Sequence, residues 1–153
     1  MYKKVSIIMN CYNGDNYLEE SLNSVINQTY KNWELIFYDN CSTDKSAIIL
    51  KKYKDKRIKY FKSKKKINLG LARKKALLKA KGDFIAFLDT DDMWKKNKLK
   101  KQLKFFNDEK IGFVITNSIF FDKFKSKNFY SSNKNFEKKV FYKLIENYFI
   151  SFD

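Results

Sequence analysis

The chain has 153 residues, of which 44% are hydrophobic and 18% aromatic, so it has enough apolar surface for one folded domain and too much for a disordered chain. It contains no histidine, which excludes a Ser-His-Asp triad, a Cys-His pair and any His-ligated metal site. Its two cysteines, Cys11 and Cys41, form neither a disulfide framework nor a zinc site, so we expect a reducing compartment, the cytoplasm.

The formal charge of +16 is spread unevenly along the chain. Residues 1–50 hold four basic and six acidic side chains, whereas residues 51–153 hold 29 basic and 11 acidic ones. Two interpretations compete: a patch for polyanions or an anionic membrane surface, and the solvated faces of lysine-rich helices. Only Arg57 and Arg73 are arginines, and specific nucleic-acid readers rely on arginine, so we expect no specific nucleic-acid partner.

Apolar runs alternate with helical periods along the chain. Strands are predicted over 5–9, 33–38, 58–61, 84–88, 111–116 and 119–121, and helices over 17–26, 47–53, 71–80, 99–106 and 140–149. Predicted helix boundaries are Asp15 or Asn16 before the first helix, Ser42, Thr43 or Asp44 before the second, and Gly82 after the third. Residues 84–88 are apolar throughout, as in a central strand that is buried on both faces. The alternation predicts an α/β fold with a mostly parallel sheet and flanking helices, and the polar segment 122–137 is the expected mobile loop.

Polar clusters follow three of the predicted strands, at residues 10–14, 39–44 and 89–92. In open α/β sheets, ligands bind beyond the carboxyl ends of the strands, so this edge is the candidate pocket. Asp39 directly follows a strand, and its carboxylate could accept from a base N–H or a ribose hydroxyl, or belong to an Asx-rich turn. Tyr12 could stack on a planar base, or it could be part of the core. Arg73 lies near a helix start, where a cation reaches a base or a diphosphate.

Asp89, Asp91 and Asp92 crowd three carboxylates at the end of a strand, and their repulsion would be offset by a divalent cation. Oxygen ligands without His or Cys favour Mg²⁺ or Mn²⁺, and Mg²⁺ usually takes one or two carboxylates together with substrate phosphates. The alternative is that an aspartate caps the next helix, although one cap needs one aspartate. The cluster therefore predicts a site for a metal and a phosphate.

Together these segments resemble a known family. Residues 5–13, 17–30, 33–44, 68–73 and 82–94 resemble, in order, the blocks of family 2 glycosyltransferases with the GT-A fold, and the resemblance covers roughly residues 3–120. It implies that Tyr12, Asn13 and Asp39 contact the nucleotide, with Arg73 nearby. It also implies that Asp89-Thr90-Asp91 is the metal-binding Asp-x-Asp, with Asp91 as the main ligand for Mn²⁺ or Mg²⁺ and with Asp89 and Asp92 supporting the ribose, the metal or the loop.

The implied reaction is inverting transfer of a sugar from a nucleotide-diphospho-sugar, expected to be a UDP-sugar, to a glycan or lipid-linked acceptor in cell-surface polysaccharide synthesis. The expected organisation is a single GT-A domain over 1–153, with a donor-binding core over 1–120 and an incomplete acceptor region over 121–153. The general base is expected beyond Asp153, since Asp122, Glu137 and Glu146 are poor candidates on context.

The sequence departs from the family pattern at two turns: Asn10-Cys11 stands where many members have Pro-Thr, and Asp39-Asn40 where many have two aspartates. The lysine-rich part is compatible with peripheral contact at the inner membrane face. The alternative function is a polyanion or membrane-surface binding module whose GT-A domain binds a donor without turning it over.

Overall fold

The computed structural model describes residues 3–116, 118–121 and 126–128. The chain divides into two compact units, Met1–Phe113 and Val114–Asp153, and each is described here by itself. The predicted helix over 140–149 and the acidic residues Asp122, Glu137 and Glu146 lie outside the described residues. The organisation as a single GT-A domain over 1–153, with a donor-binding core over 1–120, stays a prediction.

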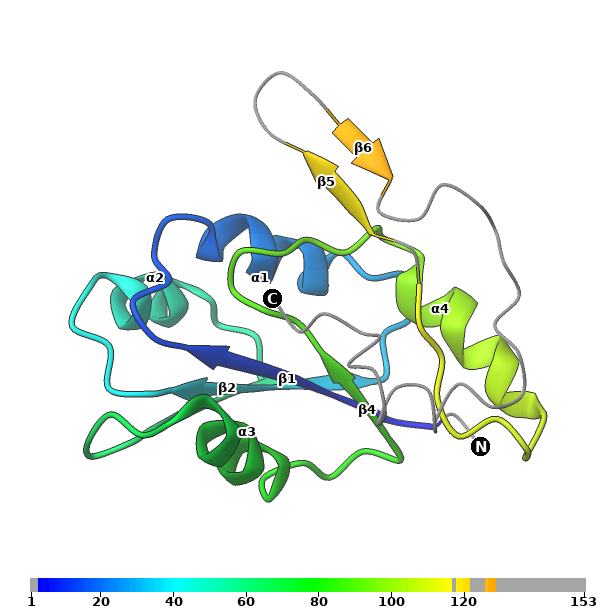
Figure 1. Ribbon diagram of the computed structural model, residues 1–153, viewed down its shortest axis with the longest axis horizontal. Helices are drawn as coiled ribbons and strands as arrows, with labels where there is room; N and C mark the ends of the chain where they lie inside the picture. The colour runs from blue at the N-terminus through cyan, green and yellow to red at the C-terminus, as the bar shows by residue number, and fades with distance from the viewer. Residues whose placement is uncertain (1–2, 117, 122–125, 129–153) are drawn as a thin grey trace. The chain divides into compact units, whose positions relative to one another are not determined.

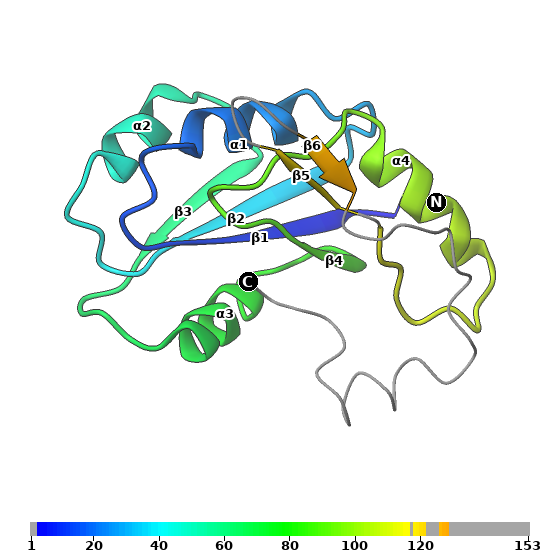
Figure 2. The same cartoon turned by 45° about the horizontal axis from the view of Figure 1, so that its top comes forward.

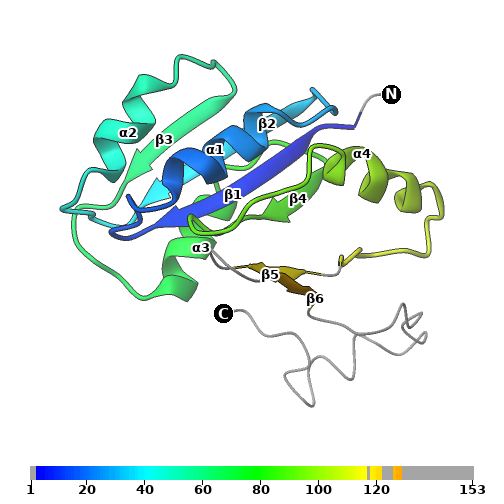
Figure 3. The ribbon, with the colours of Figure 1, turned by 90° about the horizontal axis from the view of Figure 1, so that it is seen from above.

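The first unit is a parallel sheet with helices on both faces (Figure 1, Figure 2, Figure 3). Its strands are β1 (Val5–Cys11), β2 (Trp33–Asp39), β3 (Ile58–Lys62) and β4 (Phe84–Phe87), and they lie in the order β3-β2-β1-β4. Its helices are α1 (Leu18–Ile26), α2 (Ser46–Lys52), α3 (Leu69–Leu77) and α4 (Lys98–Leu103), and the short 3₁₀ helix η1 (Lys104–Asn107) continues α4. This arrangement confirms the predicted α/β class with a mostly parallel sheet.

The second unit contains a short antiparallel pair, β5 (Ile119–Phe121) with β6 (Ser126–Asn128). The prediction of a strand over 119–121 is confirmed. Strand β6 was not predicted, because its residues lie in the polar segment 122–137 and carry no apolar alternation. Residues 111–116 form no strand, so that prediction is wrong.

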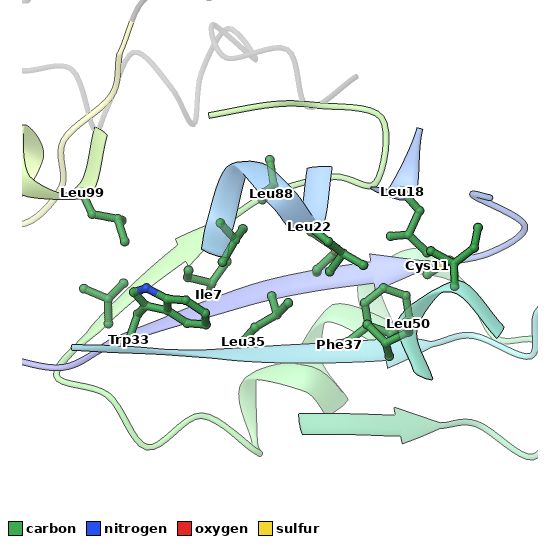
Figure 4. Close-up of a cluster of buried hydrophobic side chains, with 14 residues drawn as sticks. Ile7, Cys11, Leu18, Leu22, Trp33, Leu35, Phe37, Leu50, Leu88 and Leu99 are labelled. Carbon is green, nitrogen blue, oxygen red and sulfur yellow. The ribbon is translucent and has the colours of Figure 1, made fainter. Parts of the chain in front are cut away.

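The strands β1 and β2 pair over their full length, from Val5 opposite Trp33 to Cys11 opposite Asp39. Their apolar runs are buried on both faces, as a strand in the middle of a parallel sheet requires. Figure 4 shows the larger apolar cluster between these strands and α1, with Leu18 and Leu22 pointing down onto the sheet. On the opposite face α3 lies close to β1 and β2 through the small side chains of Ala72 and Ala76, and a smaller cluster forms there.

Strand β4 differs from its prediction as a central strand buried on both faces. Within the described residues β4 lies at the edge of the sheet, and the side chains of Ile85 and Phe87 are 42% and 51% exposed. The alternate residues, Phe84 and Ala86, pack against the larger apolar cluster on the other face. This face of β4 is exposed because α3 packs against β1 and β2.

In the described part of the chain, every helix is too short or too polar to cross a bilayer.

Several predicted helix boundaries are wrong. Helix α1 begins after Tyr17 without a side-chain cap, and the carboxylate of Asp15 instead accepts a hydrogen bond from the backbone N–H of Lys45. The carboxylate of Asp44 accepts from the N–H of Ser46, the first residue of α2, although Lys45 is the N-cap residue. Helix α3 ends at Leu77, five residues before Gly82. Gly82 therefore serves the start of β4 instead of a helix end.

A buried carboxylate, that of Glu34 on β2, contacts β1, β3 and the segment before β4 at the amino edge of the sheet. It accepts hydrogen bonds from the ammonium groups of Lys4 (2.9 Å) and Lys59 (2.7 Å), from the hydroxyl of Ser6 (2.7 Å) and from the backbone N–H of Lys81 (2.7 Å). Burial alone raises the pKa of Glu34, but these hydrogen bonds outweigh burial and lower the pKa to about 2. The carboxylate therefore holds β1, β2, β3 and the start of β4 together only while it is ionised.

We expect acid to remove this contribution. In the unfolded chain a glutamate has a pKa of ~4.3. The stabilisation that ionised Glu34 provides is therefore fully present above pH ~4.3 and is lost as the pH falls through the folded-state pKa of about 2. The free energy of unfolding of the wild type should therefore exceed that of Glu34→Gln by about 2 kcal/mol at neutral pH, with the gap narrowing below pH ~4. Urea unfolding of both proteins at several pH values measures the gap. A gap that stays constant down to pH ~2 would contradict this assignment.

Candidate functional site

The carboxyl ends of β1, β2 and β4 bring the three polar clusters together. The backbone N–H of Asn40 donates to the carbonyl of Cys11 at 2.7 Å, which keeps the first two clusters side by side beyond the strands. On the other side of β1, Gly14 lies so close to Thr90 that an added Cβ would be 2.6 Å from its hydroxyl oxygen. The segment after β1 therefore lies between the segments that follow β2 and β4, as predicted for one shared edge.

Asn13 fastens the loop after β1 to the loop after β2. Its backbone is in the left-handed region, with φ of 52°, which asparagine tolerates better than most residues. Its side-chain oxygen accepts from the N–H of Thr43 at 2.9 Å, and its own N–H donates to the hydroxyl of Ser42 at 3.1 Å. The carbonyl oxygen of the Asn13 side chain thus serves the loops themselves, and the predicted nucleotide contact of Asn13 stays a prediction.

Asp39 is fully buried, instead of open to the candidate pocket as expected. One carboxylate oxygen accepts from the N–H of Ser42 at 2.7 Å, and the other accepts from the hydroxyl of Tyr60 at 2.7 Å and lies 3.8 Å from the ammonium of Lys62. Burial, followed by the hydrogen bond to Asp39 and its charge, raises the pKa of Tyr60 above its usual range, so this hydroxyl remains a donor. Each carboxylate oxygen keeps a second acceptor direction.

The loop between β3 and α3 folds over the same edge. The side chain of Asn40 holds the loop at two points, donating to the carbonyl of Ile67 at 2.7 Å and accepting from its N–H at 3.0 Å. An amide can form this pair and a carboxylate cannot, since only the amide both donates and accepts. From this loop the ammonium of Lys66 lies 3.8 Å from the ring centroid of Tyr12. Tyr12 is 45% exposed, which excludes the alternative that it is a core residue.

Arg73 and Asp89 meet across the sheet edge. The guanidinium of Arg73, on α3, lies 3.3 Å from a carboxylate oxygen of Asp89. The side chain of Asn68 accepts from the N–H of Leu71 at 2.8 Å and so caps the start of α3, which fixes the helix that carries Arg73. The backbone carbonyl of Asp89 accepts from the hydroxyl of Ser21, so the acidic segment is also anchored to α1. The fold thus brings two oppositely charged side chains together at the candidate site.

The carboxylates of Asp89, Asp91 and Asp92 lie at the rim of the sheet. Burial, and then the negative charges of Asp91 and Asp89, raise the pKa of Asp92, so the three side chains do repel one another. Helix α4 starts at Lys98 with Asn97 as its N-cap residue, so none of the three aspartates caps it. Among the described residues no three acidic or cysteine side chains converge closely enough to hold an ion by themselves. These side chains alone therefore form no metal centre, and an ion here would have to take one or two carboxylates and complete its shell elsewhere.

Sequence reasoning missed three residues of this edge: Tyr60, Asn40 as a loop anchor, and Lys66. Tyr60 reaches Asp39 because β3 pairs with β2 in a register that places Tyr60 opposite Phe37, two residues before Asp39. No local pattern encodes that register. The sequence shows that Asn40 departs from the family pattern, but only the structure shows that its side chain binds the backbone of Ile67.

Known proteins resemble this chain in sequence. The sequence model described as "Glycosyl transferase family 2" matches residues 6–152. The putative teichuronic acid biosynthesis glycosyltransferase TuaG of Bacillus subtilis (strain 168) is 42% identical over 114 residues, which are 73% of this chain and 45% of that protein. The UDP-Glc:alpha-D-GlcNAc-diphosphoundecaprenol beta-1,3-glucosyltransferase WfgD of Escherichia coli is 41% identical over 113 residues, 74% of this chain and 45% of that protein. The chain thus spans less than half the length of these curated relatives.

Solved structures resemble the chain in fold. The crystal structure of S. aureus TarS 1-349 in complex with UDP-GlcNAc matches with a TM-score of 0.66 and 34% sequence identity, covering 69% of this chain and 31% of that one. The mannosyltransferase PcManGT from Pyrobaculum calidifontis, in complex with GDP-Man and Mn2+, matches with a TM-score of 0.67 and 23% identity, covering 71% and 33%. At that identity the second likeness concerns the fold alone.

Proposed function

The chain belongs to glycosyltransferase family 2, and from this premise we propose that it binds a nucleotide-diphospho-sugar at the carboxyl edge of its sheet, as the donor-binding part of a metal-dependent inverting glycosyltransferase. One observation carries the proposal: the ends of β1, β2 and β4 bring an exposed aromatic ring, a buried carboxylate and a trio of aspartates to one edge, where α3 adds an arginine. These groups match the parts of such a donor, namely a planar base, ribose hydroxyls and a diphosphate.

The base is proposed to stack on Tyr12 and to donate an N–H to Asp39. The exposed ring of Tyr12 offers an apolar face, and Asp39 is the last residue of the neighbouring strand β2. Tyr60 and Ser42 hold the buried carboxylate of Asp39 in place, so a base would reach it by displacing the hydroxyl of Tyr60. A carboxylate accepts an N–H from uracil or from another base, and it is the likeness to TarS, crystallised with UDP and UDP-GlcNAc, that supports a UDP-sugar.

A divalent ion, Mn²⁺ or Mg²⁺, is proposed to be held by Asp91, with Asp89 or Asp92 as a second carboxylate, and would stabilise the negative charge on the departing diphosphate. Arg73 is bound to Asp89 and is placed to contribute positive charge to the same phosphates. Burial and the charges of Asp91 and Asp89 raise the pKa of Asp92, and a bound cation would offset that unfavourable charge. The base that deprotonates the acceptor is not assigned to any of these residues.

The acceptor is proposed to be a glycan or a lipid-linked saccharide, because the related WfgD is named for a diphosphoundecaprenol-linked acceptor. A lipid-linked acceptor would be met at a membrane surface, and the basic part of the chain is suited to peripheral contact with anionic lipid. The cytoplasm, at the inner membrane face, remains the proposed place. The alternative is a polyanion or membrane-surface binding module whose GT-A domain binds a donor without turning it over, and it predicts UDP binding without sugar transfer.

Removal of the metal tests this proposal directly. We expect UDP to bind in the presence of Mn²⁺ and its dissociation constant to rise by about tenfold or more after chelation with EDTA, since the carboxylates then repel the diphosphate. Titration calorimetry with UDP, and with uridine as the control that lacks phosphate, measures the effect. Uridine should bind equally with and without the ion. Equal affinity for UDP in the two conditions would remove the ion from the proposal, and no binding in either would contradict a donor site at this edge.

A further inference from the structure

A second concave surface lies at the opposite edge of the sheet from the proposed donor site. The segment between α1 and β2, the helix α4 and the 3₁₀ helix η1 enclose a hollow of about 600 Å³. This volume is within the range of small-molecule sites in proteins. Among its lining residues are three lysines and three neutral polar residues: Lys31, Lys100, Lys104, Thr29, Asn32 and Asn107. We call this surface the lysine hollow.

The lysine hollow has one sign of charge. None of the described residues that line it is acidic. The carboxylates nearest along the chain to its lysines are Glu34, which is buried and bound by Lys4 and Lys59, and Asp108, which accepts from the backbone N–H of Lys110. A concave surface lined by cations and left without carboxylates concentrates anions, because its walls exclude part of the screening solvent. The three ammonium groups thus form a positive field without an acidic partner among the lining residues.

The walls of the lysine hollow are fixed by the fold. The buried amide of Gln28 donates to the carbonyl of Lys95 at 3.0 Å and accepts from the N–H of Leu99 at 3.2 Å, which ties the end of α1 to the start of α4. The N–H of Thr29 donates to the carbonyl of Lys96 at 2.9 Å. Leu103, on the same helix, packs against the apolar core. The backbone that carries the lysines on both sides is therefore held before any ligand arrives, which lowers the ordering cost of binding.

From this geometry we infer that the lysine hollow binds the phosphate group of a phosphomonoester. Lysine ammonium groups bind phosphate as point charges, and three of them match the charge of close to two that a phosphomonoester carries at neutral pH. The volume exceeds that of a bare phosphate and leaves room for the organic part of the ligand. A soluble ester and the headgroup of a lipid at a membrane surface share this chemistry. The inference is independent of the donor site, because none of these residues lies at the carboxyl edge.

The test compares two triple variants of the full chain that lose the same charge. The first replaces the lysines of the hollow (Lys31→Gln, Lys100→Gln, Lys104→Gln), and the matched control replaces exposed lysines elsewhere (Lys51→Gln, Lys54→Gln, Lys75→Gln). One arm measures co-sedimentation with phosphatidylcholine vesicles that contain phosphatidic acid, and with vesicles that contain phosphatidylserine at equal surface charge. The other arm follows backbone amide shifts while glycerol 3-phosphate is added. All six positions are exposed, so thermal unfolding should be unchanged in both variants.

We expect the hollow variant to bind phosphomonoester more weakly by roughly fivefold for each lysine removed, while the control keeps the affinity of the wild type. Loss confined to phosphatidic acid vesicles identifies a lipid headgroup, and loss confined to glycerol 3-phosphate identifies a soluble ester. Equal losses in the two variants, or no preference for phosphatidic acid over phosphatidylserine and no shifts with glycerol 3-phosphate, would overturn the inference. The affinity for UDP in the presence of Mn²⁺ should be the same in both variants, so failure here leaves the donor site untouched, and the reverse also holds.

Discussion

Replacing Asp91 by asparagine is expected to weaken the binding of UDP in the presence of Mn²⁺ by about 10- to 100-fold, the usual effect of losing one charged hydrogen-bonding or ligating group. The substitution keeps the size of the side chain and removes its negative charge. Asp91 is exposed at the rim, so stability should not change. Titration calorimetry at fixed Mn²⁺ measures the dissociation constant.

The control for Asp91→Asn is Glu109→Gln, which removes one negative charge from another exposed position of the same unit. It should bind UDP like the wild type, because simple charge loss in a basic protein does not weaken anion binding. The effect of Asp91→Asn should also disappear once EDTA is present, since the remaining affinity then rests on the base and Arg73. A loss that persists in EDTA would assign Asp91 to the nucleotide itself, and no loss at all would move the ion to Asp89 and Asp92.

The strands near the middle of the sheet could be predicted from sequence to within two residues at each end. Strands β1 and β2 are buried on both faces, so their apolar runs are continuous and end where polar turn residues begin. The same rule misplaced β4, because an apolar run of four or five residues does not reveal which neighbours will cover it. Ile85 and Phe87 are predicted from the sequence to be buried, but within the described residues their side chains are about half exposed.

The candidate site could be predicted only as a set of chain segments. Parallel strands place their carboxyl ends at one edge, so residues 10–14, 39–44 and 89–92 had to meet. The individual partners could not be predicted, because they join residues that are 21 to 27 positions apart: the hydroxyl of Tyr60 with Asp39, and the amide of Asn40 with Ile67. Such pairs depend on strand register and loop path, which no short motif records. Asn40 illustrates the difference, since its departure from the family pattern marks a loop anchor.

Among the described glycines, Gly82 is the one whose replacement by alanine is expected to cost the most stability. An added Cβ would lie 2.6 Å from the backbone nitrogen of Ser6 and 2.7 Å from the carbonyl oxygen of Lys4, distances that real Cβ atoms do not show. Both contacts are backbone atoms, one in β1 and one in the residue before it, so no side chain can turn away to make room. The N–H of Gly82 also donates to the hydroxyl of Ser6 at 2.8 Å, which in turn donates to Glu34.

Relief of the clash requires the start of β4 to move away from β1, and that movement disturbs the hydrogen bonds on Glu34. We expect the free energy of unfolding to fall by about 3 kcal/mol, as for severe overpacking, and the midpoint of thermal unfolding to fall by roughly 10 °C. The matched control is Gly70→Ala on α3, where an added Cβ meets only the side chain of Asn68 at 3.6 Å. Because alanine favours a helix over glycine, this variant should be more stable than the wild type by about 0.5–1 kcal/mol. Thermal unfolding followed by circular dichroism measures both, and equal effects of the two substitutions would show that the close approach of Gly82 to β1 does not limit stability.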